Sequence, residues 1–201
     1  MRVGVLASGS GTNLQAILDA DRAGQLGPAR VVVVIANVSD ARALERSRLA
    51  GVPVELVEHN AYTSRATFDA ALLATLARYE VELVALAGFM RILTPAFLRG
   101  FPERVVNIHP SLLPAFPGVH AQKQALEYGA RVAGCTVHFV DEGLDSGPII
   151  SQSAVTIADD DDLPQLTSRI LAEEHRLYPA AIRAIAEGRV QILGRRVIIK
   201  S

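Results

Sequence analysis

An asparagine and a histidine two positions apart are the residues of this 201-residue chain best suited to catalysis. They end Val105–His109, an apolar run typical of a buried strand, and Pro110 follows directly. Side chains alternate along a strand, so Asn107 and His109 should share one face, and Pro110 keeps His109 extended. An amide and an imidazole at the carboxyl end of a strand could stabilise an oxyanion and transfer protons near neutral pH. A capping asparagine and a buried structural histidine are the alternative.

A glycine-rich turn, Ser8-Gly-Ser-Gly-Thr-Asn13, lies between an apolar strand and a helix and suits an anion. Glycines let the backbone turn sharply, and the amides at a helix start attract negative charge. The dinucleotide fingerprint would need a third glycine where Leu14 stands, and an ATP or GTP loop would need a lysine. The turn therefore predicts a monophosphate site, with a simple helix cap on Thr12 or Asn13 as the alternative.

Two carboxylates could complete such a site. Asp145 lies in the Asp141–Pro148 loop, between two expected strands, and could orient or charge an imidazole, although an ordinary acidic turn explains the loop equally well. Glu174 lies in the apolar stripe of the last helix, where a carboxylate needs a partner or a ligand unless it sits solvated at the edge of the stripe. The histidines and Cys135 lack metal-ligand spacing, so no metal is expected.

The elements that must position these residues alternate between strands and helices. Apolar strands are expected near residues 2–7, 31–36, 54–57, 81–87 and 105–109, with helices near 14–24, 41–50, 65–79 and 95–99 between them. Continuous apolar strands with helical crossovers predict an α/β fold, a doubly wound, mostly parallel sheet with helices on both faces. The C-terminal part should add a helix near 119–129, antiparallel strands at 132–140 and 148–157, a long helix at 163–188 and a hairpin at 190–200.

Composition narrows the class of protein. The chain has 20 Lys and Arg against 21 Asp and Glu, so no overall field attracts nucleic acid or an anionic membrane. A mean hydropathy of +0.26 excludes a disordered chain, and one cysteine excludes a disulfide scaffold. No apolar run has the length of a membrane helix, and the first residues lack a signal-peptide pattern. We therefore expect a cytoplasmic protein whose partners are small molecules, with neither a nucleic acid nor a membrane among them.

Four motifs in order along the chain together resemble the phosphoribosylglycinamide formyltransferases, folate-dependent enzymes of purine synthesis. The motifs are Ser8–Asn13, Ala87-Gly-Phe-Met-Arg-Ile-Leu93, Asn107-Ile-His-Pro-Ser-Leu-Leu-Pro114 and Asp141-Glu-Gly-Leu-Asp-Ser-Gly-Pro-Ile149. The resemblance implies the formyltransferase fold. It also implies transfer of a formyl group from 10-formyltetrahydrofolate to the primary amine of phosphoribosylglycinamide, by direct attack without a covalent enzyme intermediate.

The resemblance also implies roles for individual residues. Asn107, His109 and Asp145 match the catalytic trio: Asn107 and protonated His109 would stabilise the oxyanion, and Asp145 would support the charged imidazole and help to move a proton. The positions that match the substrate site are Gly11, Thr12, Asn13 and Glu174. The positions that match the folate site are Arg65, Met90, Arg91, Ile92, Leu93, Asp141, Glu142, Gly143 and Leu144.

One formyltransferase domain is expected over residues 1–201, as a monomer or homodimer. Residues 1–110 would form the phosphate-binding half, and residues 111–201 would complete the folate site. Methionyl-tRNA formyltransferase should carry a further C-terminal domain and a basic surface, and formyltetrahydrofolate hydrolase an N-terminal regulatory domain. The broken glycine pattern disfavours a nucleotide-binding reductase. A phosphate-binding module without activity requires that Asn107, His109 and Asp145 do not converge.

Overall fold

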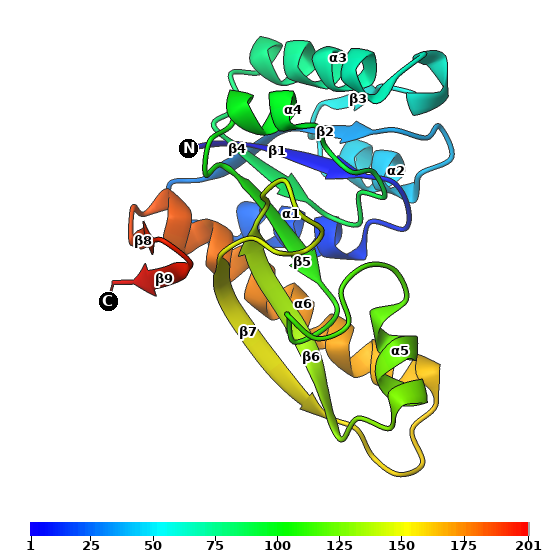
Figure 1. The fold of residues 1–201 in the computed structure, drawn as a ribbon. Helices are drawn as coiled ribbons and strands as arrows, with labels where there is room; N and C mark the ends of the chain where they lie inside the picture. The colour runs from blue at the N-terminus through cyan, green and yellow to red at the C-terminus, as the bar shows by residue number, and fades with distance from the viewer. Residues whose placement is uncertain (201) are drawn as a thin grey trace.

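The computed structural model describes residues 1–200 and is built around one nine-stranded sheet of order β3-β2-β1-β4-β5-β6-β7-β9-β8 (Figure 1). Five strands pair in parallel: β1 (Arg2–Ala7), β2 (Arg30–Ala36), β3 (Val54–Leu56), β4 (Leu83–Leu86) and β5 (Val105–His109). Antiparallel pairing adds β6 (Val132–Phe139) and β7 (Ile149–Thr156), and β8 (Val190–Leu193) and β9 (Arg196–Ile199) form a hairpin. The predicted mostly parallel α/β sheet with antiparallel C-terminal strands is confirmed.

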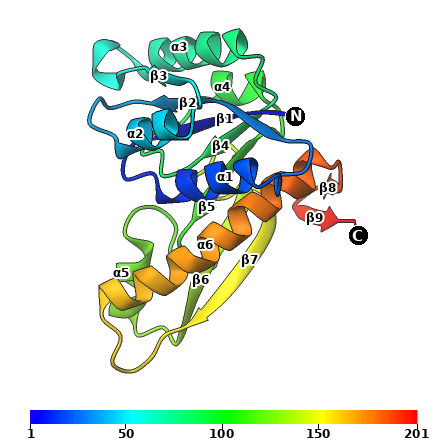
Figure 2. The same ribbon diagram turned by 180° about the vertical axis from the view of Figure 1, so that it is seen from behind.

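Helices cover both faces of this sheet, as the two opposite views show (Figures 1 and 2). One face carries α3 (Arg65–Arg78) and α4 (Pro95–Gly100), and the other carries α1 (Thr12–Arg22), α2 (Arg42–Leu49) and the long α6 (Leu163–Ala186). The short α5 (Ala121–Tyr128) packs against α6. Each face has its own apolar core, because each amphipathic helix buries its apolar stripe against the sheet. Among residues 1–200, no helix combines the length and hydropathy that crossing a membrane requires.

Local backbone conformation moves two boundaries from their predicted places. The helix expected from Val119 begins at Ala121, because His120 has a left-handed φ of 60° and cannot continue a helix backwards. The strand expected over 81–87 is confined to Leu83–Leu86, and a short 3₁₀ turn at His59–Ala61 was not predicted. Neither change moves a predicted site residue to another element.

The carboxyl ends of the central parallel strands meet at one edge of the sheet, where the predicted loops also lie. The loop after β1 and the loop after β4 are joined there, since Ser8 N donates to the Gly88 carbonyl at 3.0 Å. Met90 N returns a hydrogen bond to Ser8 Oγ at 2.8 Å. In open α/β sheets this edge forms the ligand crevice.

Candidate active site

The catalytic candidates meet where β5 pairs with β6. Asn107 and His109 lie on one face of β5, as their spacing predicts, and the antiparallel register places His138 of β6 opposite Asn107. Asn107 Nδ2 lies 3.2 Å from His138 Nε2, and His138 Nδ1 lies 2.9 Å from the Phe139 carbonyl oxygen. His138 is 2% exposed, and this burial lowers its pKa. A second, unpredicted histidine is therefore part of the group.

His109 is buried between two hydrogen-bond acceptors. Its Nε2 lies 3.0 Å from the Phe116 carbonyl oxygen, and its Nδ1 lies 3.4 Å from Asp145 Oδ2. A carbonyl and an ionised carboxylate can only accept, so a proton on each ring nitrogen satisfies both contacts. A ring with hydrogen on both nitrogens could therefore interact with the Phe116 carbonyl and the Asp145 carboxylate at the same time.

Asp145 is held in place by its own loop. Its Oδ2 also accepts from Gly118 N at 2.8 Å, and its φ of 48° is left-handed, a conformation that costs about 1–3 kcal/mol outside glycine. The loop sustains this strain because Asp141 Oδ1 accepts from Ser146 Oγ at 2.7 Å and from Gly143 N at 3.1 Å. Asp141 therefore stabilises the turn that presents Asp145.

The segment after His109 is fixed to β6 by a buried threonine. Thr136 Oγ1 donates to the Ser111 carbonyl at 2.6 Å and accepts from Leu113 N at 3.1 Å. Gln152 of β7 donates to the Leu113 carbonyl at 2.9 Å. The proline-rich segment that supplies Phe116 to His109 is thereby anchored to the sheet.

The predicted anion loop opens onto the start of α1. Gly11 occupies the position before the helix with φ 68°, and no side chain caps the amides that follow. A Cβ on Gly11 would lie 3.0 Å from Ala43 Cα, so glycine is needed both for conformation and for space. Uncapped amides at a helix start, on a chain bent tightly against α2, could hold an anion.

Asn13 and Glu174, predicted separately, are in direct contact. Asn13 Nδ2 donates to Glu174 Oε2 at 2.7 Å, linking α1 to α6 across 161 residues. Glu174 is 4% exposed, and its burial raises the pKa of the carboxyl to about 7, against a smaller opposing effect of the Asn13 hydrogen bond. The buried carboxylate on the apolar stripe has an amide partner rather than a cation.

A cavity of about 320 Å³ adjoins the anion loop, lined by Thr12, Gln15, Ala16, Asp19, Arg46 and His175. Arg46 is held against the loop, since its Nε donates to the Ser10 carbonyl at 2.9 Å and its Nη1 to Gln15 Oε1 at 3.1 Å. Burial and the charge of Arg46 lower the pKa of His175. Within residues 1–200, His175 Nε2 and Asn13 Oδ1 are buried without a hydrogen-bond partner, as expected where a polar ligand binds.

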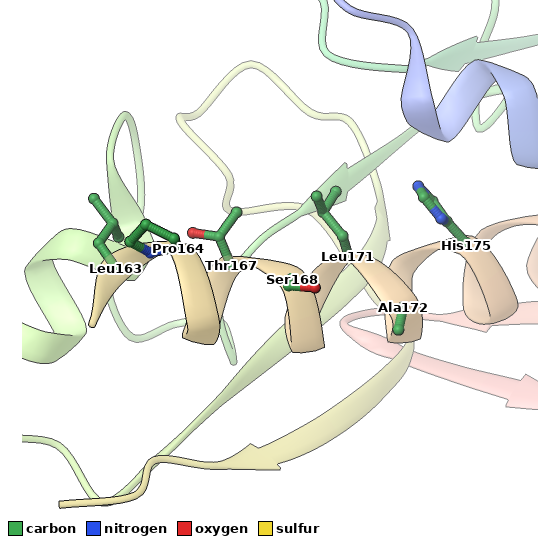
Figure 3. Close-up of a pocket in the computed structure, with 7 residues that line it drawn as sticks. All are labelled: Leu163, Pro164, Thr167, Ser168, Leu171, Ala172 and His175. Carbon is green, nitrogen blue, oxygen red and sulfur yellow. The ribbon is translucent and has the colours of Figure 1, made fainter. Parts of the chain in front are cut away.

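A longer groove of about 620 Å³ follows the N-terminal half of α6, and Figure 3 shows the side chains that line it. They are Leu163, Pro164, Thr167, Ser168, Leu171, Ala172 and His175. His175 borders both this groove and the cavity beside Arg46. The α6 surface therefore leads directly to the anion loop.

The predicted folate positions divide into exposed and anchored residues. Met90, Ile92 and Leu144 expose large apolar side chains, whereas Leu93 is buried in the core. Arg65 is exposed at the first position of α3, Arg91 is partly buried, and Glu142 and Gly143 lie exposed in the Asp141–Pro148 loop. Exposed apolar side chains beside a polar loop suit a flat, partly apolar ligand.

Sequence reasoning missed His138, Arg46 and Thr136. His138 and Thr136 are two positions apart on β6 and so share a face. The residues that they face on β5 depend on the β5–β6 register, which the sequence does not give. Arg46 lies on the polar helix α2, and no sequence motif there indicates that it contacts the glycine-rich turn. Within the described residues 1–200, no cluster of three or more histidine, cysteine, aspartate or glutamate side chains could hold a metal ion.

Comparison with known proteins gives consistent matches. The formyl transferase family model matches residues 1–182. The phosphoribosylglycinamide formyltransferase of Escherichia coli strain K12 is 43% identical over 192 residues, which cover 96% of this chain and 90% of that protein. The trifunctional purine biosynthetic protein adenosine-3 of Drosophila melanogaster is 50% identical over 188 residues, or 93% of this chain, which spans only 14% of that longer protein.

Solved structures show the same similarity. The glycinamide ribonucleotide transformylase 1 of Symbiobacterium toebii superposes with a TM-score of 0.98 at 59% identity, covering 100% of this chain and 94% of that one. The phosphoribosylglycinamide formyltransferase of Bacillus halodurans superposes with a TM-score of 0.89 at 44% identity, covering 92% and 95%. The formyltransferase fold expected from the sequence is confirmed.

Proposed function

This chain belongs to the phosphoribosylglycinamide formyltransferase family of purine biosynthesis, and we propose that it transfers a formyl group from 10-formyltetrahydrofolate to the primary amine of phosphoribosylglycinamide. The observation that carries the proposal is the arrangement of His109 between Asp145 and the Phe116 carbonyl, next to Asn107. A charged imidazole and an amide beside each other suit the oxyanion of acyl transfer.

The substrate phosphate would bind at the start of α1. Gly11, Thr12 and Asn13 offer amides that no side chain caps, and Arg46, which lines the same cavity as Thr12, adds a positive charge. The unpartnered His175 Nε2 supports a polar ligand at this position. Phosphate recognition thus would rest on local donors, because the net charge of the chain is only −1.

The glycinamide end of the substrate would meet Glu174. Within residues 1–200 its buried carboxyl has one hydrogen-bond partner, Asn13, and burial raises its pKa more than this hydrogen bond lowers it. An incoming amide or amine would provide the missing partner. The carboxyl therefore can take up the substrate's nitrogen end while Asn13 keeps it oriented.

The folate donor would bind beside the exposed apolar side chains of Met90 and Ile92, between the Ala87–Leu93 loop and the Asp141–Pro148 loop. Arg65, Arg91, Leu93, Glu142, Gly143 and Leu144 complete the positions proposed for it. The donor supplies the formyl carbon that the substrate amine attacks. Its leaving nitrogen must gain a proton, and the attacking nitrogen must lose one.

His109 and Asn107 would stabilise the oxygen that becomes negative in this attack. The Nε2 proton of His109 would exchange the Phe116 carbonyl for this oxygen, and Asn107 Nδ2 would donate its second hydrogen. Asp145 Oδ2, 3.4 Å from His109 Nδ1, would support and orient the imidazolium, and it could help to take the proton from the attacking amine. Positioning and oxyanion stabilisation would provide most of the acceleration.

Direct transfer is favoured because the single cysteine is unsuited to covalent catalysis. Cys135 is buried, and this burial raises the pKa of its thiol to about 12, with further contributions from Glu174 and Glu173. A thiol of this kind is almost entirely protonated at neutral pH. The amine of the substrate would then attack the formyl carbon directly, without help from Cys135.

The chain would act as one formyltransferase domain, with residues 1–110 binding the phosphate and residues 111–201 completing the folate site. Ser201 lies outside the described residues. We propose a monomer or homodimer that acts on small molecules alone, without a metal.

An assay of 10-formyltetrahydrofolate consumption tests the proposed function. We expect consumption that requires phosphoribosylglycinamide and yields one formylated product for each folate released. Consumption without any amine would instead identify a hydrolase. Consumption that requires methionyl-tRNA would identify a tRNA formyltransferase. No consumption under any condition would leave a binding module and overturn the proposal.

A further inference from the structure

Within residues 1–200, the Asn107 side chain has one hydrogen-bond partner, the Nε2 atom of His138, 3.2 Å away. An amide can rotate to exchange its oxygen and nitrogen, and only the neighbouring groups decide which atom faces the reacting centre. Which ring nitrogen of His138 carries the hydrogen therefore determines whether Asn107 turns its oxygen or its nitrogen toward a substrate.

The contact made by the other ring nitrogen of His138, Nδ1, indicates where this hydrogen lies. Nδ1 lies 2.9 Å from the Phe139 carbonyl oxygen, which can only accept, so Nδ1 must carry a hydrogen. In a neutral ring Nε2 is then an acceptor, and the group facing it must donate. Asn107 consequently turns its Nδ2 toward His138, with one hydrogen used and one left.

We propose that His138 is a positioning residue that acts as the neutral Nδ1–H tautomer and fixes the Asn107 amide so that its free Nδ2 hydrogen faces the carbonyl oxygen of the formyl donor. The inference rests on the proposed function, in which Asn107 stabilises that oxygen. His138 itself touches no reacting atom.

The surroundings of His138 keep it neutral. Its burial lowers its pKa, and the charge of nearby His109 adds to this effect. The Phe139 carbonyl and the carboxylates of Asp145 and Asp141 act in the opposite direction but have smaller effects than burial. A protonated His138 would favour the rotated amide, with the Asn107 oxygen toward Nε2, and would compete for Asp145, whose Oδ1 lies 3.8 Å from Nε2.

The two histidines of the site thus have complementary environments. His109 faces two acceptors, which suits a charged ring, whereas His138 faces one acceptor and one donor, which suits a neutral ring. Strand register creates the difference, because β6 pairs His138 with Asn107 and shifts its register against β7 between Val137 and His138. Bulges of this kind often redirect side chains beside active sites.

Two substitutions separate positioning from structural support. His138→Leu removes the acceptor, and His138→Gln keeps an acceptor near the position of Nε2. We expect H138L to lower kcat about 10- to 100-fold with KM for both substrates changed less than about threefold, and H138Q to recover most of the loss. His59 is the matched control, because its Nδ1 also lies 3.2 Å from an asparagine Nδ2, that of Asn37, outside the site. H59L and H59Q should leave kcat unchanged.

The tautomer can be measured directly in the unmodified protein by ¹⁵N NMR of the imidazole nitrogens. We expect His138 to carry its proton on Nδ1 and to be neutral at pH 7, because its burial lowers its pKa. Asn107→Asp would place an acceptor opposite Nε2 and should protonate His138 at pH 7. A proton on Nε2 in the unmodified protein, or a charged ring at pH 7, would overturn the inference even if the substituted chains fail to fold.

The kinetic outcomes distinguish the inference from the proposed function. An unmodified enzyme that transfers formyl to phosphoribosylglycinamide, with H138L at full kcat, overturns only the role of His138. An equal loss in H138L and H138Q indicates that packing alone requires histidine, which also contradicts positioning. An unmodified chain without this transfer overturns both.

Discussion

Two carboxylates, the partly buried Asp145 and the buried Glu174, mark the two ends of the site and differ in almost every physical respect. Asp145 lies in a loop with a left-handed backbone and contacts an imidazole and a backbone N–H. Glu174 lies within the 24-residue helix α6, and among residues 1–200 its one hydrogen-bond partner is the uncharged amide of Asn13. Cations and N–H donors favour the ionised form of a carboxyl group, whereas burial beside a single amide favours the protonated form.

This difference suggests separate roles for the two carboxylates, with Asp145 acting in the reaction and Glu174 in substrate binding. Asp145 faces His109, so its negative charge can stabilise an imidazolium during the reaction. Glu174 faces the anion loop through Asn13, and its pKa of about 7 leaves it poised between both forms at neutral pH. We therefore expect changes at the Asp145 end to lower kcat, and changes at the Glu174 end to alter binding and the pH dependence of stability.

The largest effect should follow from Asp145→Asn or His109→Ala. Asparagine keeps the shape of the aspartate but removes the charge that supports the imidazolium, and alanine removes the imidazole itself. We expect kcat to fall about 10²- to 10⁴-fold in each variant, measured by steady-state formyl transfer. Because both residues act through one ion pair, the double variant should lose little more than either single variant.

Asp160→Asn is the control for this prediction, since it removes an exposed carboxylate next to α6 and should not change kcat. Near-normal turnover in folded H109A would refute the catalytic role of His109. Fully additive losses in the double variant would show that Asp145 and His109 act independently.

A smaller effect is expected on stability when Glu174 is replaced by glutamine. The carboxyl has a pKa of about 7 in the folded chain against 4.5 as its ordinary value, so the folded state binds this proton more tightly. The associated stability is fully present below pH 4.5 and is lost as the pH rises through 7. The shift corresponds to about 3 kcal/mol.

Urea unfolding of the ligand-free protein between pH 5 and pH 8 measures this loss. The difference in unfolding free energy between the unmodified chain and E174Q should change by about 2.5 kcal/mol over that range, in favour of E174Q at pH 8. Glu173→Gln is the matched neighbour: hydrogen bonds from Ser153 and Arg176 lower the pKa of Glu173, so it stays ionised from pH 5 to 8. A pH-independent difference for E174Q would show that Glu174 is charged in the folded chain.

The same comparison shows what could be inferred from the sequence. Strand alternation placed Asn107 and His109 on one face, and the apolar stripe marked Glu174 as a carboxylate that needs a partner, because both features depend on local periodicity. The partners themselves depend on contacts between distant segments. Asn13 meets Glu174 only because α1 packs against α6, and His138 meets Asn107 only through the antiparallel register. No local pattern specifies either contact.

The smallest effect should come from Tyr178→Phe, which tests whether the two ends are independent. Tyr178 lies one turn after Glu174 on α6, and its buried hydroxyl lies 3.0 Å from the carbonyls of Leu86 and Val106, on β4 and β5. Removing one such hydrogen bond should lower the free energy of unfolding by about 1 kcal/mol. Because the rest of the β5 ladder stays intact, we expect kcat within about twofold of the unmodified enzyme.

Urea unfolding and steady-state kinetics on the same Y178F preparation measure both quantities. Tyr79→Phe provides the control, since its hydroxyl bonds Glu55 at 2.8 Å in a half-buried position far along the chain from α6, and its loss should cost less. If Y178F instead lowers kcat more than tenfold, α6 must position the catalytic strand as well as the substrate end. Glu174 and Asp145 would then be coupled through one helix, and the separation of chemistry from recognition would fail.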